Sequence, residues 1–211
     1  MAEYADRAAA GAALVPSLAA WRGSDAIVVG IPRGGVVVAA GVARGLGLPL
    51  TAVAVRKLGI PSQPEVAAGA IAADARVINS DAVRAGGVTP GQLADVERVE
   101  AAELQRRTAR YGTGGADVAG RTVIVVDDGV ATGATALAAC RALSARGAAH
   151  IVLAVPVAPA RWRPPTDAVD EWVCPSQPRD FWAVGQYYDD FAQTGDAEVV
   201  ALLHDPRAGG D

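Results

Sequence analysis

The fold is decided by residues 123–135, which read Val123-Ile124-Val125-Val126-Asp127-Asp128-Gly129-Val130-Ala131-Thr132-Gly133-Ala134-Thr135. The first four are apolar and β-branched, which predicts a strand buried on both faces. Two adjacent carboxylates, Asp127 and Asp128, follow at the expected strand end. A turn of small residues then leads into a helix predicted over 134–146.

The two parts of this turn suit two parts of one ligand. Adjacent acids repel each other and lose hydration, so a polyol or a cation nearby would offset their cost. The turn 131–135 offers backbone N–H groups, two hydroxyls and the positive end of a helix, which suit a phosphate monoester. A diol site followed by a phosphate site describes a ribose 5-phosphate. The alternative is a plain strand–turn–helix with an acidic turn and a Thr N-cap, a much less specific pattern.

Strand and helix signals alternate along the chain, and a helix start at Thr89 carries a capping box with Gln92. Alternation of this kind predicts an α/β fold, a mostly parallel twisted sheet flanked by helices, with ligands at the carboxyl ends of its strands. The expected helices cover 3–21, 35–47, 89–110, 134–146 and 196–203, and the expected strands cover 26–30, 50–55, 67–72, 76–78, 123–126 and 151–155.

The chain is expected to form one structural domain with two parts. Residues 1–155 form the core, with an N-terminal helix and a mobile or helical insertion over 60–120 that ends in a Gly-rich linker over 111–120. Residues 156–211 form a small C-terminal hood and a last helix. Three of the four tryptophans lie after residue 160, which marks the change of character.

Composition narrows the class of protein. The 211 residues are 51% hydrophobic and 20% charged, so most of the chain is expected to be ordered. A formal net charge of −4 argues against a nucleic-acid partner. A basic leader and a membrane-spanning apolar stretch are both lacking, so a cytoplasmic protein without a membrane partner is expected. Cys140 and Cys174 form no CxxC pair, and buried thiols are the simpler interpretation than a disulfide.

Other nucleotide and phosphate chemistries fit the sequence less well. It contains no GxxxxGK[ST] sequence and no GxGxxG after a strand, which argues against P-loop and dinucleotide-binding proteins. A hydrolase with Asp127 as nucleophile would need a DxDx-type start with a distant Lys and further acids, and this pattern is not found.

The stretch 123–135 resembles the motif with which type I phosphoribosyltransferases bind 5-phosphoribosyl-1-pyrophosphate (PRPP). The resemblance implies that Asp127 and Asp128 hold the ribose 2′ and 3′ hydroxyls. It implies that the 5′-phosphate is held by Ala131, Thr132, Gly133, Ala134 and Thr135. The whole chain looks closest to a bacterial group called predicted phosphoribosyltransferases, some members of which are fused to hydrolase domains.

Two further loops agree with this resemblance. The first strand ends in Gly30-Ile31-Pro32-Arg33-Gly34-Gly35, where glycine amides and Arg33 suit an anion. This loop resembles the family's pyrophosphate loop, and an ordinary strand-to-helix turn is the alternative. The second strand is expected to end in Arg56-Lys57, which resembles a basic pair that the family places on pyrophosphate. As an alternative, both are surface charges.

The hood resembles that of 6-oxopurine phosphoribosyltransferases. By analogy Trp172 stacks on a base and the backbone of Val173 reads its edge, whereas an ordinary core role for Trp172 is the alternative. Two departures leave the purine assignment open. Ala131 stands where the 6-oxopurine enzymes have an acid, and Arg179 stands near a point where the purine hood often carries one.

The resemblance implies a pentosyltransferase that moves the 5-phosphoribosyl group of PRPP to a nitrogenous base or other nitrogen nucleophile, with Mg²⁺ as cofactor. Catalysis would rest on Arg33, Lys57, Asp127 and Asp128, and the two acids would also contact the metal indirectly. PRPP would further contact Gly34, Gly35 and Arg56. A homodimer is possible in this family. The alternative function is a regulator that binds PRPP or a nucleotide without turnover.

Overall fold

The computed structural model describes residues 2–112 and 117–205, except for the side chains of residues 64 and 65. Five parallel strands form the central sheet, in the order β2-β1-β6-β7-β8. This confirms the predicted α/β fold with a mostly parallel sheet. The strands are β1 (Ile27–Gly30), β2 (Leu50–Ala52), β6 (Thr122–Val126), β7 (His150–Ala154) and β8 (Glu171–Val173).

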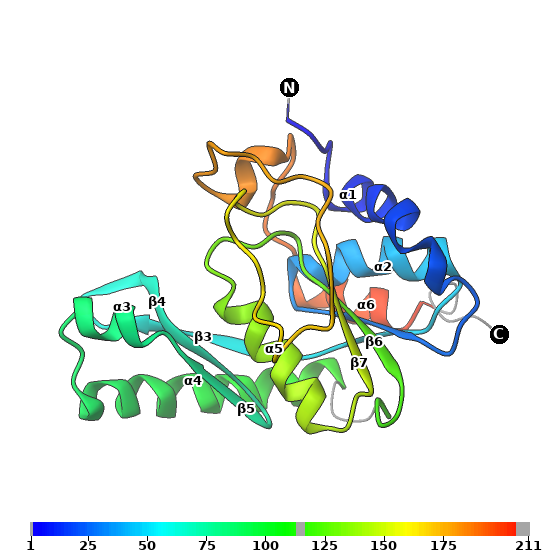
Figure 1. Ribbon diagram of the computed structural model, residues 1–211. Helices are drawn as coiled ribbons and strands as arrows, with labels where there is room; N and C mark the ends of the chain where they lie inside the picture. The colour runs from blue at the N-terminus through cyan, green and yellow to red at the C-terminus, as the bar shows by residue number, and fades with distance from the viewer. Residues whose placement is uncertain (1, 113–116, 206–211) are drawn as a thin grey trace.

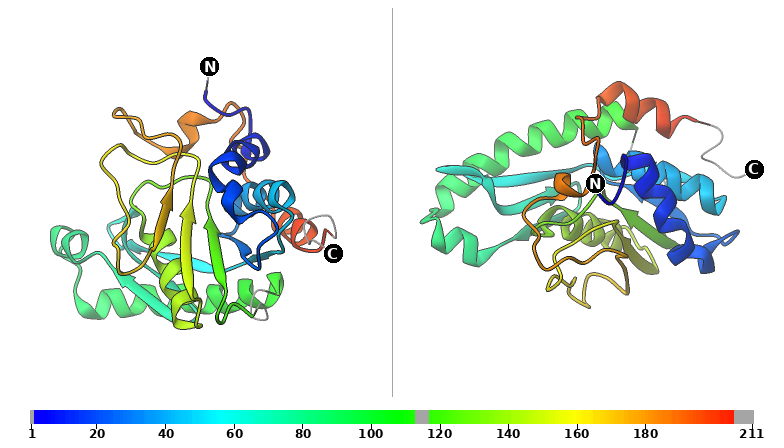
Figure 2. Two further views of the ribbon diagram at one scale, coloured as in Figure 1. Left: turned by 45° about the vertical axis from the view of Figure 1, so that its right-hand side comes forward. Right: turned by 90° about the horizontal axis from the view of Figure 1, so that it is seen from above.

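Helices cover both faces of this sheet, because the central strands are apolar on both sides (Figure 1, Figure 2). Ile124 and Val126 pack in one cluster with α2 (Gly34–Leu46), whereas Val123 and Val125 pack in another with α5 (Ala134–Ala145). Successive residues of a strand point to opposite faces, so one run of β-branched side chains fills both layers.

The N-terminal segment packs on α2 and differs from the single helix expected over 3–21. It forms α1 (Arg7–Leu14) and then the 3₁₀ helix η1 (Val15–Trp21). Pro16 lies at the start of η1, where it lacks the N–H that a continuing α-helix would use. Leu14 and Leu18 are fully buried in the α2 cluster.

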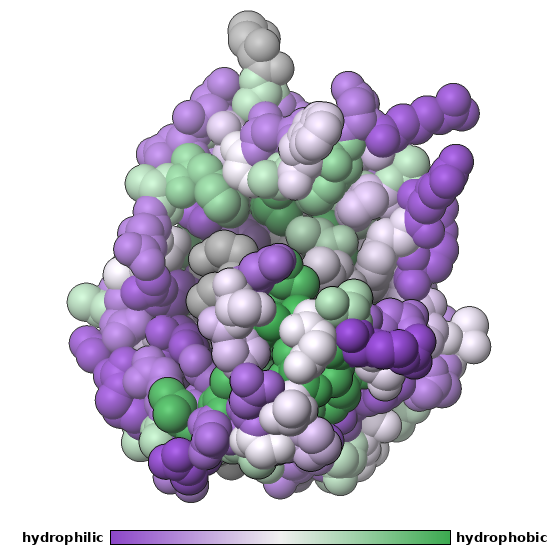
Figure 3. All heavy atoms as spheres, turned by 90° about the vertical axis from the view of Figure 1, so that its left-hand side faces the viewer, coloured by the Kyte–Doolittle hydropathy of each residue, from purple (hydrophilic) through white to green (hydrophobic). Residues whose placement is uncertain are grey.

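A second sheet projects to one side of the main body (Figure 1). Its strands are antiparallel: β3 (Val55–Ile60), β4 (Gln63–Ala72) and β5 (Ala75–Ile78). Helices α3 (Ser80–Ala85) and α4 (Pro90–Tyr111) follow. Leu93 and Leu104 of α4 pack on Leu58 and Ile60 of β3. The outer face of this projection is largely hydrophilic, with apolar side chains showing near its centre (Figure 3).

The single strand expected over 50–55 is wrong, and so is the placement of Arg56 and Lys57 at its end. The chain leaves the parallel sheet after Ala52 and enters the antiparallel sheet at Val55. Both basic residues therefore lie inside β3. The strand continues to Ile60 because Leu58 and Ile60 are buried there, and their side chains would be exposed to water if the strand ended at Arg56.

The helix start at Thr89 is confirmed. The Gln92 amide N–H donates to Thr89 Oγ1 at 3.3 Å, and the Thr89 amide N–H donates to Gln92 Oε1 at 2.9 Å. Helix α4 ends at Tyr111, and Gly112 is its C-cap with φ +65°. The last helix, α6 (Asp196–Leu203), has the predicted bounds. Residues 113–116 of the expected linker and the tail after 205 lie outside the described residues.

Within the described parts of the chain, no helix combines the length and the apolar character that crossing a membrane requires.

Candidate active site

The acidic pair follows the central strand β6. The Asp128 amide N–H donates to Asp127 Oδ1 at 2.9 Å, which fixes one carboxylate oxygen. Burial raises the pKa of Asp127, and the charge of Asp128 raises it further. Burial also raises the pKa of Asp128, and an ion pair with Arg7 opposes that rise. Two desolvated acids held side by side are poorly satisfied by the protein alone, which suits hydroxyl donors from a ligand.

Arg7 of α1 is a residue of this site that sequence reasoning missed. Its Nε lies 2.8 Å from Asp128 Oδ2, and both side chains are largely buried, with 11% and 17% exposed. Its Nη1 donates to the Ala192 carbonyl at 2.7 Å, and its guanidinium lies 3.9 Å from the ring centre of Phe191. Arg7 therefore joins the N-terminal helix, the acidic pair and the hood. No local pattern marks a contact between residues 121 positions apart.

The turn after the acidic pair forms the expected helix start. Gly133 is the N-cap of α5 at φ +82°, and no side chain caps the helix there. The first N–H groups of α5 therefore point to a place suited to an anion. A hollow of about 250 Å³ opens beside this turn. Its lining residues are Lys57, Asp127, Gly129, Val130, Ala131, Thr132, Gly133, Ala134, Thr135, Ala136 and Val184.

Trp162, from the loop after β7, covers the same turn. Its indole N–H donates to the Thr132 carbonyl at 3.2 Å. A Cβ at Gly133 would overlap the Trp162 ring, so this position requires glycine both for its positive φ and for space.

The loop after β1 lies against the acidic pair. A Cβ on Gly34 would overlap Asp128 Oδ2, and one on Gly35 would lie 2.8 Å from Asp127 Oδ1. The two glycines let the start of α2 approach the carboxylates closely. The structure thus brings together Gly34, Gly35 and the two acids.

Arg33 belongs to this loop, yet its side chain turns toward α6. Its Nη1 lies 3.8 Å from Asp196 Oδ1. Asp196 also accepts a hydrogen bond from the Tyr111 hydroxyl at 2.7 Å and pairs with Arg110 at 3.1 Å. Arg33 is not among the residues that line the 250 Å³ hollow.

The two basic residues of β3 line one hollow together with Glu100 of α4. Arg56 Nε and Nη2 each lie 2.6 Å from Glu100 Oε2. Lys57 also lines the hollow beside the acidic pair and the small-residue turn, and Arg56 does not. Adjacent residues of a strand point to opposite faces, which lets Lys57 reach this second hollow.

Trp172 and Val173 lie in β8 and do not line the hollow. The Trp172 ring packs edge-on against Trp162, with ring centres 5.0 Å apart, and its indole nitrogen is buried without a hydrogen-bond partner among the described residues. The Val173 carbonyl accepts from the Val155 amide at 3.0 Å. Their role in base binding stays a prediction. Val184 of the 3₁₀ helix η2 (Val184–Tyr187) is the hood residue that does line the hollow.

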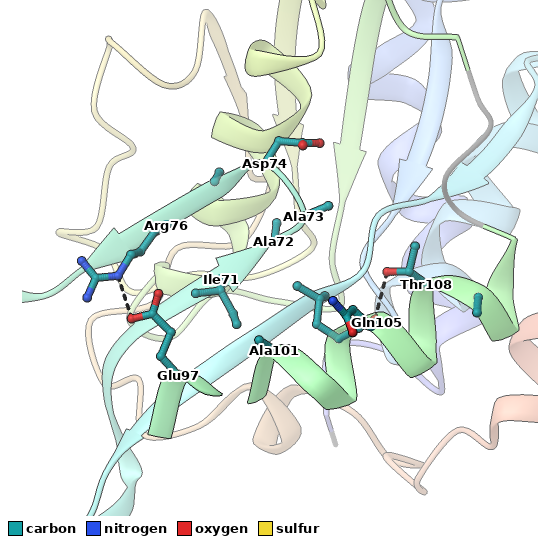
Figure 4. A pocket seen from close by; sticks show the side chains of 12 residues that line it. Ile71, Ala72, Ala73, Asp74, Arg76, Glu97, Ala101, Gln105 and Thr108 are labelled. Atoms are coloured by element: carbon teal, nitrogen blue, oxygen red, sulfur yellow. Dashed lines mark hydrogen bonds and ion pairs between the residues drawn. The ribbon is translucent and has the colours of Figure 1, made fainter. Parts of the chain in front are cut away.

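A larger hollow of about 730 Å³ lies elsewhere, between the β4–β5 turn and α4 (Figure 4). Its lining includes several alanines and the ion pair of Arg76 with Glu97, at 2.9 Å. Arg76 and Glu97 neutralise each other, which leaves Asp74 as the one charged side chain of this lining without an ion pair among the described residues, so few polar groups converge there as they would in a substrate site.

The carboxylates of Asp127 and Asp128 are the oxygen donors of this site that could serve the Mg²⁺ implied by the family resemblance. Among the described residues, no group of three or more His, Cys, Asp or Glu side chains is placed to hold a metal ion. One Asp128 oxygen is also engaged by Arg7. Mg²⁺ prefers oxygen ligands, keeps several waters and commonly binds through substrate phosphates, so the two acids fit an indirect role toward such an ion better than a direct one.

Comparison with known proteins agrees with this geometry. The family described as "Phosphoribosyl transferase domain" matches residues 6–192. The Mycobacterium tuberculosis protein Rv0571c, provisionally named a phosphoribosyl transferase, is 47% identical over 207 residues, which are 95% of this chain and 46% of that protein. The chain thus spans about half the length of the curated relatives it matches.

Solved structures share the architecture. The protein TT1426 of Thermus thermophilus is 40% identical, with a TM-score of 0.74 over 95% of this chain and 97% of that one. A Neisseria gonorrhoeae protein with bound ppGpp is 16% identical, with a TM-score of 0.52 over 96% and 97% of the two chains, and so shares the fold alone. On the match to residues 6–192, the chain belongs to the phosphoribosyl transferase domain family.

Proposed function

We propose that this chain transfers the 5-phosphoribosyl group of PRPP to a nitrogen nucleophile and releases pyrophosphate. One observation carries the proposal: the acidic pair, the small-residue turn of α5, the Gly34–Gly35 loop and Lys57 converge at the strand ends. Diol, phosphate and pyrophosphate sites are all needed for PRPP, and each has a counterpart there.

In this proposal the residues act by positioning and electrostatics. Asp127 and Asp128 accept hydrogen bonds from the ribose hydroxyls, and the amides opening α5 hold the 5′-phosphate. The bond from C1′ to the pyrophosphate oxygen breaks, its electrons leave with pyrophosphate, and a bond from C1′ to the nucleophile nitrogen forms. Lys57 and the Gly34–Gly35 amides stabilise the departing charge. Mg²⁺, when bound with PRPP, would neutralise part of that charge.

Arg33 and Arg56 are proposed to contact pyrophosphate only if their side chains first leave the ion pairs that they form in this structure. Arg33 would need to turn from Asp196 to reach pyrophosphate, and Arg56 would need to leave Glu100. The Arg33 contact, at 3.8 Å against 2.6 Å for Arg56, is the easier to exchange, because the attraction between two charges falls with their distance.

The same two ion pairs favour the second candidate, a regulator that binds PRPP or a nucleotide without turnover. A regulator releases no pyrophosphate, so it does not require Arg33 and Arg56 to be available for stabilising a leaving group. A regulator would still use the acidic pair and the small-residue turn 131–135, called the phosphate turn below.

The deciding experiment measures pyrophosphate release from PRPP and Mg²⁺ across a panel of bases and small amines, with calorimetry of PRPP binding alongside. Release that is lost in Lys57→Met supports the transferase. Tight PRPP binding without release from any acceptor supports the regulator. Absence of pyrophosphate release, of PRPP binding and of nucleoside monophosphate binding in the same calorimetry rules out both candidates.

A further inference from the structure

The hood holds a further hollow, of about 710 Å³, that the acidic pair and the phosphate turn do not line. Pro159, Ala160 and Arg161 form one wall, and Arg179 forms the other. The Ala160 amide N–H donates to the Pro178 carbonyl at 3.0 Å, which joins the two walls. We name this hollow the arginine cleft.

The two segments that form the arginine cleft also reach the proposed PRPP site, although the two hollows have no lining residue in common. The Val130 amide N–H donates to the Val157 carbonyl at 3.0 Å, and Trp162 contacts the phosphate turn. The other wall continues from Arg179 to Val184, which lines the 250 Å³ hollow. Figure 2 shows the yellow segment that follows β7 and the orange hood segment at the same end of the molecule. A ligand in the cleft would therefore lie at the same end of the molecule as the proposed PRPP site.

The two arginines of the cleft differ from most arginines of the chain. Across residues 2–112 and 117–205, neither Arg161 nor Arg179 has a carboxylate within ion-pair distance, although Asp180 is the sequence neighbour of Arg179. Arg163 nearby is turned back on its own loop, with Nη1 donating to the Ala160 and Trp162 carbonyls at 3.3 and 2.6 Å. Arg161 and Arg179 are both exposed to solvent, and an anion between them would relieve the repulsion of two like charges that line one hollow.

We propose that the arginine cleft binds an anionic group carried by the acceptor, so that the acceptor is a nitrogen heterocycle or amine bearing a carboxylate. This inference rests on the proposed transferase function. Guanidinium groups bind planar carboxylates with paired, charge-assisted hydrogen bonds. The 5′-phosphate and pyrophosphate already have counterparts at the α5 start and at Gly34–Gly35, which leaves the acceptor as the molecule that the cleft would hold.

The experiment uses acceptors that differ only or mainly in the carboxylate: nicotinate against nicotinamide, and orotate against uracil. Pyrophosphate release from PRPP and Mg²⁺ gives kcat/KM for each. We expect the acid of a pair to exceed its neutral partner by about tenfold or more, the range of a hydrogen bond between charged groups. Arg161→Gln and Arg179→Gln should each remove most of that preference and leave KM for PRPP unchanged. Arg22→Gln, an exposed arginine of the N-terminal segment, is the matched control and should keep the preference.

Other outcomes separate this inference from the proposed function. Equal rates for both members of each pair, with release intact, overturn the inference and leave the transferase standing. A raised KM for PRPP in Arg161→Gln or Arg179→Gln also overturns it, because the cleft would then hold a phosphate of PRPP. Inorganic phosphate that inhibits against PRPP and loses its effect in these two variants points the same way.

Release from no acceptor contradicts the transferase instead. The cleft is then tested by calorimetry of nicotinate and nicotinamide with the unmodified chain and both variants. Arginine-dependent binding of nicotinate alone supports a carboxylate site, and equal binding of the two compounds, or none, overturns it.

Discussion

Arg7 and Asp128 lie 121 positions apart in the sequence and 2.8 Å apart in the structure. Replacing Arg7 by Met should lower the free energy of unfolding by about 2–3 kcal/mol, because it strands a largely buried carboxylate. The same change should weaken PRPP binding about tenfold, because loss of Arg7 raises the pKa of Asp128 further and a protonated carboxyl accepts a ribose hydroxyl less well. Urea unfolding and calorimetry measure the two effects. Arg7→Lys should recover part of both, and Arg22→Met should change neither; wild-type values for Arg7→Met would contradict the role given to this ion pair.

The acidic pair can be tested at the same scale. Asp127→Asn combined with Asp128→Asn should abolish measurable PRPP binding, because amides replace two acceptors that suit a diol. The fold should persist, since removing two buried like charges offsets the loss of the Arg7 partner. Calorimetry with PRPP and a urea midpoint decide this, with the exposed Asp25→Asn as control. Unchanged PRPP affinity in the double variant would mean that the ribose site lies elsewhere.

At the scale of elements, the start of α2 is pressed against the acidic pair. A Cβ on Gly35 would lie 2.8 Å from both Asp127 Oδ1 and the Val126 carbonyl oxygen. Gly35→Ala should therefore push the helix start away, lower stability by about 1–3 kcal/mol and weaken PRPP binding. Gly91→Ala in α4 is the matched control, because a Cβ there meets no atom within 4 Å. Its stability should stay level or rise by about 0.5–1 kcal/mol. Similar losses in both variants would show that the close approach at Gly35 is unimportant.

At the scale of the whole molecule, the two thiols report on opening of the fold. Both cysteines are free, and burial raises the pKa of Cys140 and of Cys174 to about 12. Since the thiolate is the reactive form, neither should react quickly with a disulfide reagent at about pH 8, below the ordinary thiol pKa. Cys140 lies in α5 with no exposed surface, so its labelling should follow global unfolding in urea. Rapid labelling of Cys140 below the unfolding transition would show that α5 opens locally, together with the phosphate turn it begins.

The sequence by itself determined the features that depend on contiguous residues. The buried strand β6, the acidic turn, the helix start at Ala134 and the capping box at Thr89 all follow from local patterns. A strand buried on both faces needs apolar residues in succession, and a cap needs particular side chains three positions apart. The family resemblance was carried first by residues 123–135, which are likewise contiguous.

Only the tertiary structure decided which distant groups meet. Strand β3 continues past Arg56 into an antiparallel hairpin, and Arg56 pairs with Glu100. Arg33 lies toward Asp196, and the ring of Trp172 packs against Trp162. These outcomes depend on which faces of separate elements pack together and on the charges that happen to lie across from them. Periodicity within one segment contains no such information, because the energy of an ion pair or a ring contact depends on both partners and the segment holds only one.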